Sequence, residues 1–393
     1  MSDAIVVVGM ARTPLGGLQG ALADVSAADL GACAIKAAIE RSQVPSDAID
    51  ETFMGCVLPA GQGQAPARQA SLAAGIPMST GCTTINKMCG SAMKAVMLGM
   101  DAIRAGSVNI VAAGGMESMT NAPYLLPKAR AGMRLGHAQV IDHMFLDGLE
   151  DAYDKGKLMG TFAEATATKY DFSREAQDAY AIESLNRAKK AIEDGKFKHE
   201  IAPVLVKTRK GEVVVDTDEQ PGNAMIDKIP NLKPAFAKDG TVTAANSSSI
   251  SDGAAALVLM KESEASNRGL KPLARILAHS TNAHEPAWFT TAPVGAIQKV
   301  LAAVNWKVED VDLFEVNEAF AVVTMAAMSE LNLPHEKVNV NGGACALGHP
   351  IGASGARIMV TLMAALSDKG MKRGIASLCI GGGEATAVAL EMI

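Results

Sequence analysis

A cysteine at a short junction is the first residue whose type and place could do chemistry. Cys89 lies in residues 86–94 (NKMCGSAMK), between a short apolar run and a helical pattern that begins with small residues. Small residues let a substrate approach the backbone, and a helix N-terminus presents unpaired N–H groups and partial positive charge. We expect both to lower the pKa of this thiol toward a reactive thiolate. The alternative is a buried structural cysteine, because free cysteines are commonly core residues.

A histidine in a glycine-rich loop is the natural partner for such a thiol. His349 lies in residues 341–355 (NGGACALGHPIGASG), ahead of an expected helix, and Pro350 restricts it to an extended backbone. Imidazole is the usual base that activates a thiol. The alternatives are a phosphate loop or a capped core histidine. No Gly-Lys-Ser/Thr follows, which excludes a Walker loop.

Two further strand ends carry polar groups. Cys379 ends an apolar strand in residues 377–383 (SLCIGGG), and the N–H groups of the glycines after it could form an oxyanion hole beside a thiol that moves a proton. Asn317 and Glu318 lie in residues 316–320 (VNEAF), where the asparagine is placed to hold a water or a histidine. The alternatives are a plain turn after the strand and, for Glu318, simple capping of the next helix.

Taken together, two thiols and one imidazole suit acyl transfer through a thioester. One thiolate takes the acyl group, and the other thiol takes or gives a proton at carbon. The cysteines and histidines lack the close spacing of metal ligands. Gly114 and Gly115 lack the full G-x-G-x-x-G pattern of a dinucleotide site. We therefore expect neither a metal nor a prosthetic group.

Composition limits the class of protein. The chain has 393 residues, 49% of them hydrophobic, with a net charge of -6 and six cysteines. The charge argues against a nucleic acid or an anionic membrane as the main partner. The cysteines show no paired spacing, so we expect reduced thiols and a cytoplasmic protein. No apolar run approaches the ~20 residues of a membrane span.

Short β runs alternate with amphipathic helices in the first and last thirds, which predicts an α/β fold with a parallel sheet covered on both faces. Ser26 and Asp29 have the form of a capping box that opens the first helix. Residues 108–113 are expected to form a strand closed by the glycines 114–115. The middle of the chain is richer in charge and loops, including a turn or loop at 220–223. We interpret it as an insertion with one long helix near 174–194.

The last third of the chain resembles the first third in outline. Residues 47–53 resemble 310–314, with Asp50 on Asp312, and residues 109–118 resemble 375–385. Two matches in the same order favour duplication. We expect two similar α/β units packed as a pair, with the site at strand ends and helix N-termini near their seam.

Five motifs in series carry a resemblance to the thiolase family, the acetyl-CoA C-acyltransferases, over nearly the full length. They are residues 86–91, 114–118, 317–320, 348–355 and 379–383. The resemblance implies an α/β fold of two duplicated five-stranded halves with an inserted loop domain, usually in homodimers or homotetramers. The implied divisions are 1–118 completed by about 247–268 (N-terminal half), 119–246 (loop domain) and 269–393 (C-terminal half).

The resemblance also implies roles for five residues. Cys89 would become acylated after His349 deprotonates it, and the N–H groups of Cys89 and Gly381 would form the oxyanion hole. His349, with a water held by Asn317, would stabilise the carbonyl oxyanion of the second substrate. Cys379 would remove the α-proton of acetyl-CoA in condensation, or protonate the departing enolate in thiolysis. Acetyl-CoA, 3-ketoacyl-CoA and CoA would be the substrates and products, by a ping-pong scheme within fatty acid metabolism.

The implied substrate contacts are less uniform across the family. Ser248 falls where the family contacts pantetheine, and Met159 and Phe320 fall on positions that line the acyl pocket. Many short-chain biosynthetic thiolases have a histidine where this chain has Leu158. The replacement removes a polar contact near the acyl group or pantetheine. It would allow a longer or bulkier chain than acetoacetyl.

Residues 218–224 lack an arginine that some relatives use against the CoA nucleotide. The candidates to replace it are Lys207, Arg209, Lys210 and Lys228, with plain solvated surface residues as the alternative. Two competing functions are a decarboxylating ketoacyl synthase and a non-catalytic CoA or lipid binder. The first would need a His-Gly-Thr-Gly-Thr loop, and the second would have no need for Cys89, His349 and Cys379 together.

Overall fold

The computed structural model describes residues 3–209 and 211–393. Within these ranges a ten-stranded sheet has the order β12-β13-β14-β11-β1-β10-β5-β3-β4, with β2 paired to β10, and two small hairpin sheets lie outside it. The strands are β1 Ile5–Arg12, β2 Gly16–Gly17, β3 Glu51–Gly55, β4 Gly81–Ile85, β5 Ile110–Ser118, β6 Tyr124–Leu125, β7 Ile141–Asp142, β8 Val204–Thr208, β9 Gly211–Val215, β10 Ser251–Lys261, β11 Ala274–Ala283, β12 Leu313–Val316, β13 Arg373–Ile380 and β14 Glu384–Met392. The helices are α1 Ala27–Ser42, α2 Pro66–Ala73, α3 Ser91–Ala105, α4 Met159–Lys169, α5 Arg174–Glu193, α6 Glu219–Asn223, α7 Glu262–Asn267, α8 Ala292–Val304, α9 Ala321–Leu331, α10 Ala344–Leu347 and α11 Ser354–Lys369.

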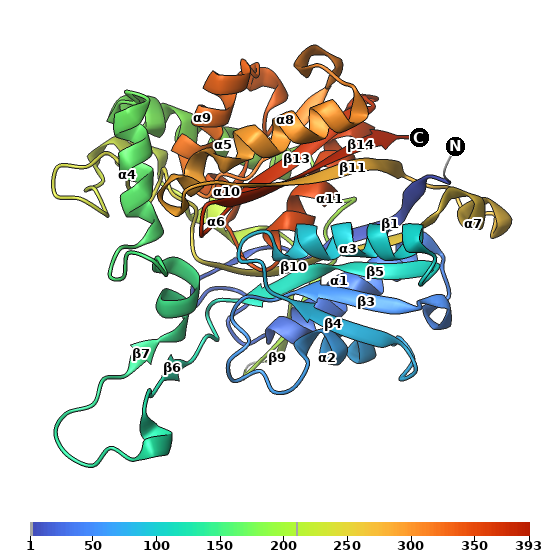
Figure 1. The fold of residues 1–393 in the computed structure, drawn as a ribbon, viewed down its shortest axis with the longest axis horizontal. Coiled ribbons are helices and arrows are strands. Elements are labelled where there is room, and N and C mark those ends of the chain that lie inside the picture. Colours follow the sequence, from blue (N-terminus) through green and yellow to red (C-terminus); the bar gives the residue numbers. More distant parts are fainter. Residues whose placement is uncertain (1–2, 210) are drawn as a thin grey trace.

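The large sheet consists of two halves that meet where β1 pairs with β11, at Ile5 and Ile276. Counted outward from this seam, one half runs β1-β10-β5-β3-β4 and the other β11-β14-β13-β12. A single parallel bridge between Phe314 and Val338 occupies the place of a fifth strand in the second half. The two halves therefore repeat one strand order, and Figure 1 shows β11, β14 and β13 in one half and β10, β5, β3 and β4 in the other.

Matching aspartates give direct evidence of the duplication. The Asp50 carboxylate accepts two backbone N–H groups where the chain enters β5, at 2.7 and 3.0 Å. The Asp312 carboxylate does the same where the chain enters β13, at 2.9 and 2.8 Å. The equivalence of Asp50 and Asp312 is confirmed. The second sequence match was out of register, because the structure aligns the starts of β5 and β13 and not the two glycine clusters.

The prediction of a parallel sheet was wrong for most of the strand pairs. Only β3–β4, β3–β5 and β12–β13 are parallel, and the remaining pairs of the large sheet are antiparallel. β13 and β14 illustrate the reason: the three residues between them are too few for a crossover connection. Gly382 and Gly383 in this turn have φ of +92° and +87°, which glycine adopts without strain.

The predicted end of the strand at Gly114 and Gly115 was also wrong. β5 continues through both glycines to Ser118 and is buried along its whole length. A side chain at Gly115 would overlap the backbone carbonyl of Gly352, in the loop ahead of α11. These glycines therefore serve close packing inside a strand, where the sequence had suggested the end of the strand.

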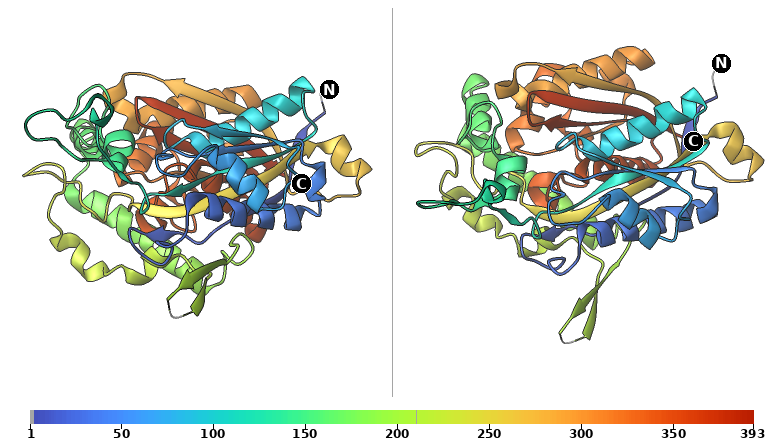
Figure 2. Two further views of the ribbon diagram at one scale, coloured as in Figure 1. Left: turned by 90° about the horizontal axis from the view of Figure 1, so that it is seen from below. Right: turned by 60° about the horizontal axis from the view of Figure 1, so that its bottom comes forward.

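Two central helices lie between the half-sheets, and others cover the outer faces (Figures 1 and 2). Methionines of α3 and α11, such as Met93 and Met359, share one apolar cluster with residues of both half-sheets. Helices α1 and α2 pack on the outer face of the N-terminal half, and α8 and α9 on that of the C-terminal half. This layering places the N-termini of α3 and α11 at the centre of the molecule.

The N-cap at Ser26 is confirmed, since its hydroxyl accepts the Asp29 N–H at 3.1 Å at the start of α1. The full capping box is not, because the Asp29 carboxylate accepts the Ser26 hydroxyl at 2.7 Å in place of the backbone N–H that a capping box requires. The long helix of the insertion is α5, which ends one residue before the predicted limit. The insertion also contains α4 and the short α6, where the sequence had suggested only a turn or loop. Across the described residues, no helix is both long and apolar enough to cross a membrane.

Candidate active site

The N-terminal ends of α3 and α11 lie against one another. Cys89 immediately precedes the N-cap of α3, Gly90, and His349 lies five residues before the first residue of α11. A side chain at Gly355 in α11 would overlap the backbone of Met93 in α3. Because glycine lets the two helices approach so closely, the loops that carry the thiol and the imidazole face the same space.

That space is a cavity of about 370 Å³. Seven of the nine residues predicted from the sequence line it: Cys89, Leu158, Met159, Ser248, Phe320, His349 and Gly381. Cys379 and Asn317 lie behind the wall. Cys379 is fully buried in an apolar cluster that also contains Met159 and Phe320. Asn317 is buried behind the His349 ring.

The two thiols lie close enough to influence each other. The pKa of Cys379 is raised well above the usual thiol value, first by burial and then by the charge that Cys89 would carry as a thiolate. Both cysteines are free. Cys379 therefore rests as a thiol next to the nucleophile candidate, able to donate a proton.

The predicted fall in the Cys89 pKa is contradicted. Burial raises the pKa of Cys89 to about 11, although its own N–H group and that of Gly381 act in the opposite direction by hydrogen bonding to the sulfur. The loss of hydration therefore outweighs the local dipoles. Because both N–H groups approach the same sulfur, they lie close together, as the two donors of an oxyanion hole must.

The turn that presents Cys89 is held by its own side chains. Met88 has a φ of +48°, an uncommon conformation for a residue with a side chain. The Asn86 side chain accepts the Met88 N–H at 2.9 Å, and the Ser91 hydroxyl donates to the Met88 carbonyl at 2.6 Å. Gly90 has no room for a side chain because Ile380 of β13 packs against it. The nucleophile turn is thereby fixed against the strand that carries Cys379.

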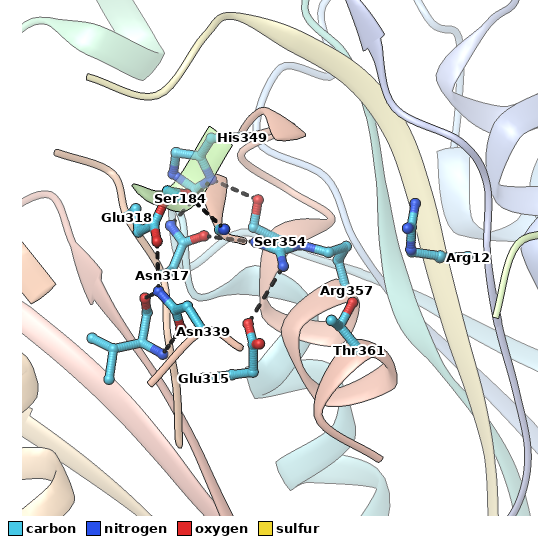
Figure 3. Close-up of polar contacts among 12 residues, drawn as sticks. Arg12, Ser184, Glu315, Asn317, Glu318, Asn339, His349, Ser354, Arg357 and Thr361 are labelled. Carbon is cyan, nitrogen blue, oxygen red and sulfur yellow. Dashed lines mark hydrogen bonds and ion pairs between the residues drawn. The ribbon is translucent and has the colours of Figure 1, made fainter. Parts of the chain in front are cut away.

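His349 is a neutral imidazole. Burial and then the positive charge of Arg357 lower the pKa of His349 to about 3. Its Nδ1 lies 2.6 Å from the Ser354 hydroxyl oxygen, whereas Nε2 is buried and has no partner among the described residues (Figure 3). A neutral imidazole with a free nitrogen can accept a proton from a thiol in the same cavity.

Asn317 is held from behind by a buried charged network (Figure 3). Arg357 donates to its side-chain oxygen at 3.2 Å and pairs with Glu315 at 3.6 Å. Burial raises the pKa of Glu315 to about 8. Arg12 continues the network through Glu200 from the N-terminal half. The Asn317 amide is thus engaged by Arg357 and the ring, and its predicted water-holding role stays a prediction.

Glu318 does not cap α9, contrary to the alternative drawn from the sequence. The N-cap is Phe320, which makes no side-chain capping bond. The buried Glu318 carboxylate accepts from Tyr180 and Ser184 of α5, at 2.9 and 2.7 Å, and from Asn339 at 2.8 Å. It therefore joins the insertion to the segment that leads to the histidine loop.

Glu117 is a buried residue near the cavity that the sequence reasoning did not single out. It accepts the backbone N–H groups of Val57 and Leu58, at 2.9 and 3.1 Å, and that of Gly352. Burial raises the pKa of Glu117 to about 7. The only sequence signal was its place in the motif at 114–118. Its contacts tie the loop after β3 to the loop that carries His349.

The described basic candidates for the CoA nucleotide lie in two different places. Lys228 lines a second cavity of about 280 Å³, which shares Ala244 and Ser249 with the first. Lys207 and Arg209 are exposed on the β8–β9 hairpin. Lys210 lies outside the described residues. In the ranges 3–209 and 211–393, no group of three or more His, Cys, Asp or Glu side chains could hold a metal ion.

The titration of Cys89 leads to a first prediction. At pH 7 we expect alkylation of Cys89 by iodoacetamide to be about 100-fold slower in His349→Ala, because the neutral imidazole no longer takes the proton during attack. The two rates should converge as pH rises toward the thiol pKa of about 11, where the thiolate forms unaided. Peptide mapping follows Cys89 separately from the other thiols. Equal rates at pH 7 would show that His349 does not assist.

Comparisons with known proteins agree with this geometry. The models of the thiolase N-terminal domain and the thiolase C-terminal domain match residues 5–263 and 270–392. The chain belongs to the thiolase family.

Its relatives are similar over their full length. An acetyl-CoA acetyltransferase from Chromobacterium violaceum is 49% identical, over 98% of this chain and 99% of that protein. One from Shinella zoogloeoides is 47% identical over 100% of both. The crystal structure of the Bacillus anthracis acetyl-CoA acetyltransferase has a TM-score of 0.97 at 41% identity, over 100% of this chain and 99% of the other. A thiolase from Ascaris suum in complex with coenzyme A has a TM-score of 0.94 at 44% identity, over 100% of both.

Proposed function

We propose that this chain is an acetyl-CoA C-acyltransferase of the acetyl-CoA acetyltransferase type. It catalyses reversible acyl transfer between CoA thioesters, by condensation of two acetyl-CoA or thiolysis of a 3-ketoacyl-CoA. The observation that carries the proposal is the meeting of Cys89, His349 and the Gly381 N–H at one cavity, with Cys379 behind it. Full-length similarity to acetyl-CoA acetyltransferases supports it.

In the first half-reaction the Cys89 sulfur attacks the thioester carbonyl of acetyl-CoA as His349 Nε2 takes the thiol proton. The N–H groups of Cys89 and Gly381 stabilise the negative charge that develops on the carbonyl oxygen. The carbon–sulfur bond to CoA then breaks, and the imidazolium returns its proton to the leaving thiolate. The products are acetyl-Cys89 and CoA. One thioester replaces another, so the step is nearly isoenergetic.

In the second half-reaction Cys379 acts at carbon. For condensation, its thiolate removes the α-proton of a second acetyl-CoA, and the enolate attacks acetyl-Cys89 to release acetoacetyl-CoA. Cys379 keeps the α-proton as its thiol, and the Cys89 thiolate takes from solvent a proton equivalent to the one that Cys379 released when it ionised, so both cysteines end as thiols. For thiolysis the same steps run backwards, and Cys379 protonates the departing enolate. The raised pKa of Cys379 keeps the resting group in the form that thiolysis uses.

The cavity wall suggests how CoA lies. Ser248 would contact pantetheine, and its backbone N–H donates to the Ala319 carbonyl at 3.0 Å, which fixes it beside the motif of Asn317. Met159, Leu158 and Phe320 would enclose the acyl group. The adjoining cavity, which Lys228 lines, would receive the nucleotide of CoA. Among the described basic candidates, only Lys228 lies next to the first cavity.

Leu158 offers a test of chain-length preference. Leu158→His should raise the ratio of kcat/KM for acetoacetyl-CoA over that for a longer 3-ketoacyl-CoA by about tenfold, because a polar group replaces apolar cavity wall. A chain-length series measures the ratio. Leu126→His is the control, since Leu126 is exposed in the insertion and lies outside the cavity lining. An unchanged ratio would mean that position 158 does not contact the acyl chain.

The division into residues 1–118 with about 247–268, 119–246 and 269–393 belongs to the same proposal. Pairing of β10 with β1 and β5 supports the return of the chain to the N-terminal half after the insertion. Homodimeric or homotetrameric assembly, cytoplasmic location and a role in fatty acid metabolism are further parts of the proposal. No cofactor beyond CoA as substrate and product is required.

The direct test is an assay of the purified chain with acetoacetyl-CoA and CoA. We expect two acetyl-CoA for each acetoacetyl-CoA consumed. Without CoA, intact mass should show one acetyl group on the protein. A non-catalytic binder would show neither turnover nor adduct, and a decarboxylating ketoacyl synthase would require a malonyl thioester.

A further inference from the structure

We infer that Ser354 is a positioning residue that holds His349 in the tautomer with hydrogen on Nδ1, so that the lone pair of Nε2 faces Cys89. The inference rests on the proposed role of His349 as a base and adds the residue that determines which nitrogen is basic. Ser354 itself would touch no substrate, because it is fully buried behind the ring.

Two contacts of the Ser354 hydroxyl fix its proton. Its oxygen lies 2.9 Å from the Pro350 carbonyl, which can only accept, so the hydroxyl donates there. The same oxygen lies 2.6 Å from His349 Nδ1. With its single proton already used, Ser354 can only accept from the ring, and Nδ1 must carry the hydrogen. Figure 3 shows the serine at the start of α11 directed at the imidazole.

A competing contact would produce the opposite tautomer. The Asn317 amide nitrogen lies 3.4 Å from the same Nδ1 and would donate to it if that nitrogen lacked hydrogen. Arg357 holds the asparagine oxygen at 3.2 Å, which fixes this orientation of the amide. The serine contact is shorter by far, and in the opposite tautomer Ser354 would have to abandon Pro350 to donate to the ring. The contact of the serine hydroxyl with Pro350 therefore favours hydrogen on Nδ1.

The unpartnered nitrogen agrees with this assignment. His349 is 6% exposed, and no described residue hydrogen-bonds to Nε2 although His349 lines the cavity. A hydrogen on Nε2 would leave a buried donor unsatisfied, and a lone pair there is what the Cys89 proton needs. Once Nε2 has taken that proton, the imidazolium retains its bond to Ser354 and presents a donor to the substrate oxygen. One fixed tautomer thus serves both steps.

The test compares Ser354→Ala with Ser251→Ala. The Ser251 hydroxyl lies 3.2 Å from the His349 backbone N–H, so its removal disturbs the same residue without touching the ring, while the Ser249 carbonyl still accepts that N–H. Nitrogen-15 NMR of protein labelled at its seven histidines reports which ring nitrogen carries hydrogen. The His349 signals are identified by their loss in His349→Gln. Alkylation of Cys89 by iodoacetamide at pH 7 gives the rate.

In the wild type and in Ser251→Ala we expect Nε2 without hydrogen. In Ser354→Ala we expect hydrogen to move to Nε2 in a large share of molecules and alkylation to slow at least about tenfold, because the wrong tautomer cannot take the thiol proton. Hydrogen on Nε2 in the wild type, or an unchanged tautomer in Ser354→Ala, would overturn the inference whatever the alkylation rate. The NMR result needs no turnover, so it is separate from the test of the proposed reaction.

Discussion

Cys89→Ala will carry no acetyl group after incubation with acetoacetyl-CoA, whereas the wild type will carry one. Turnover should fall by about 10⁶-fold, the loss seen when a covalent nucleophile is removed while the rest of a site is retained. The physical reason is that, among the described cysteines, only Cys89 lines the cavity with His349 and Gly381, whose N–H bonds to the Cys89 sulfur. Intact mass detects the adduct, and a coupled assay measures turnover.

Cys82→Ala is the matched control. Cys82 is a free, partly exposed thiol on β4 whose sulfur contacts the Thr80 carbonyl, outside the cavity lining. The Cys82→Ala variant should retain both the acetyl adduct and the activity. An acetyl group that persists on Cys89→Ala would place the nucleophile elsewhere and would invalidate the mechanism.

Cys379→Ser should separate the two half-reactions. The variant will still take an acetyl group from acetyl-CoA onto Cys89, because His349 and the two N–H groups are intact. Condensation and thiolysis should fall about 10³-fold, within the usual contribution of an acid–base group, since a hydroxyl is a far poorer proton carrier than a thiol. Exchange of the α-protons of acetyl-CoA with deuterated solvent, followed by NMR, should be lost to the same extent.

Cys33→Ser provides the comparison for that variant. Cys33 is a partly exposed free thiol on α1, and its sulfur lies 3.4 Å from the Pro203 carbonyl. Its substitution should change neither half-reaction. If Cys379→Ser exchanged α-protons at the wild-type rate, another group would have to serve as the base at carbon. The proposed division of roles between Cys89 and Cys379 would then be wrong.

Much of the candidate site could be predicted because its chemistry is local in the sequence. Cys89, His349 and Gly381 each lie in a short glycine-rich junction, and such junctions are where strands and helices of an α/β fold present groups to a ligand. The N-cap at Ser26 and the equivalence of Asp50 with Asp312 could likewise be predicted, since each rests on side chains that contact backbone near a strand or helix end.

Strand direction and burial could not be predicted from the sequence in this way. The sequence indicated α/β alternation but not that β10 and β11 run antiparallel to their neighbours, because direction depends on how distant segments pack. Gly114 and Gly115 were expected to end a strand, yet they allow close contact inside β5. Glu318 suggested a helix cap, yet its partners Tyr180 and Asn339 come from segments far along the chain.

The amino-acid sequence by itself determined which groups this protein brings to its reaction: two thiols, an imidazole and glycine N–H groups at the ends of strands and helices. Tertiary structure alone decided their protonation. Packing of α3 against α11 buries Cys89 and raises its pKa, while burial beside Arg357 keeps His349 neutral. A pKa depends on hydration and on charges brought close by folding, and neither is encoded in the neighbours of a residue along the chain.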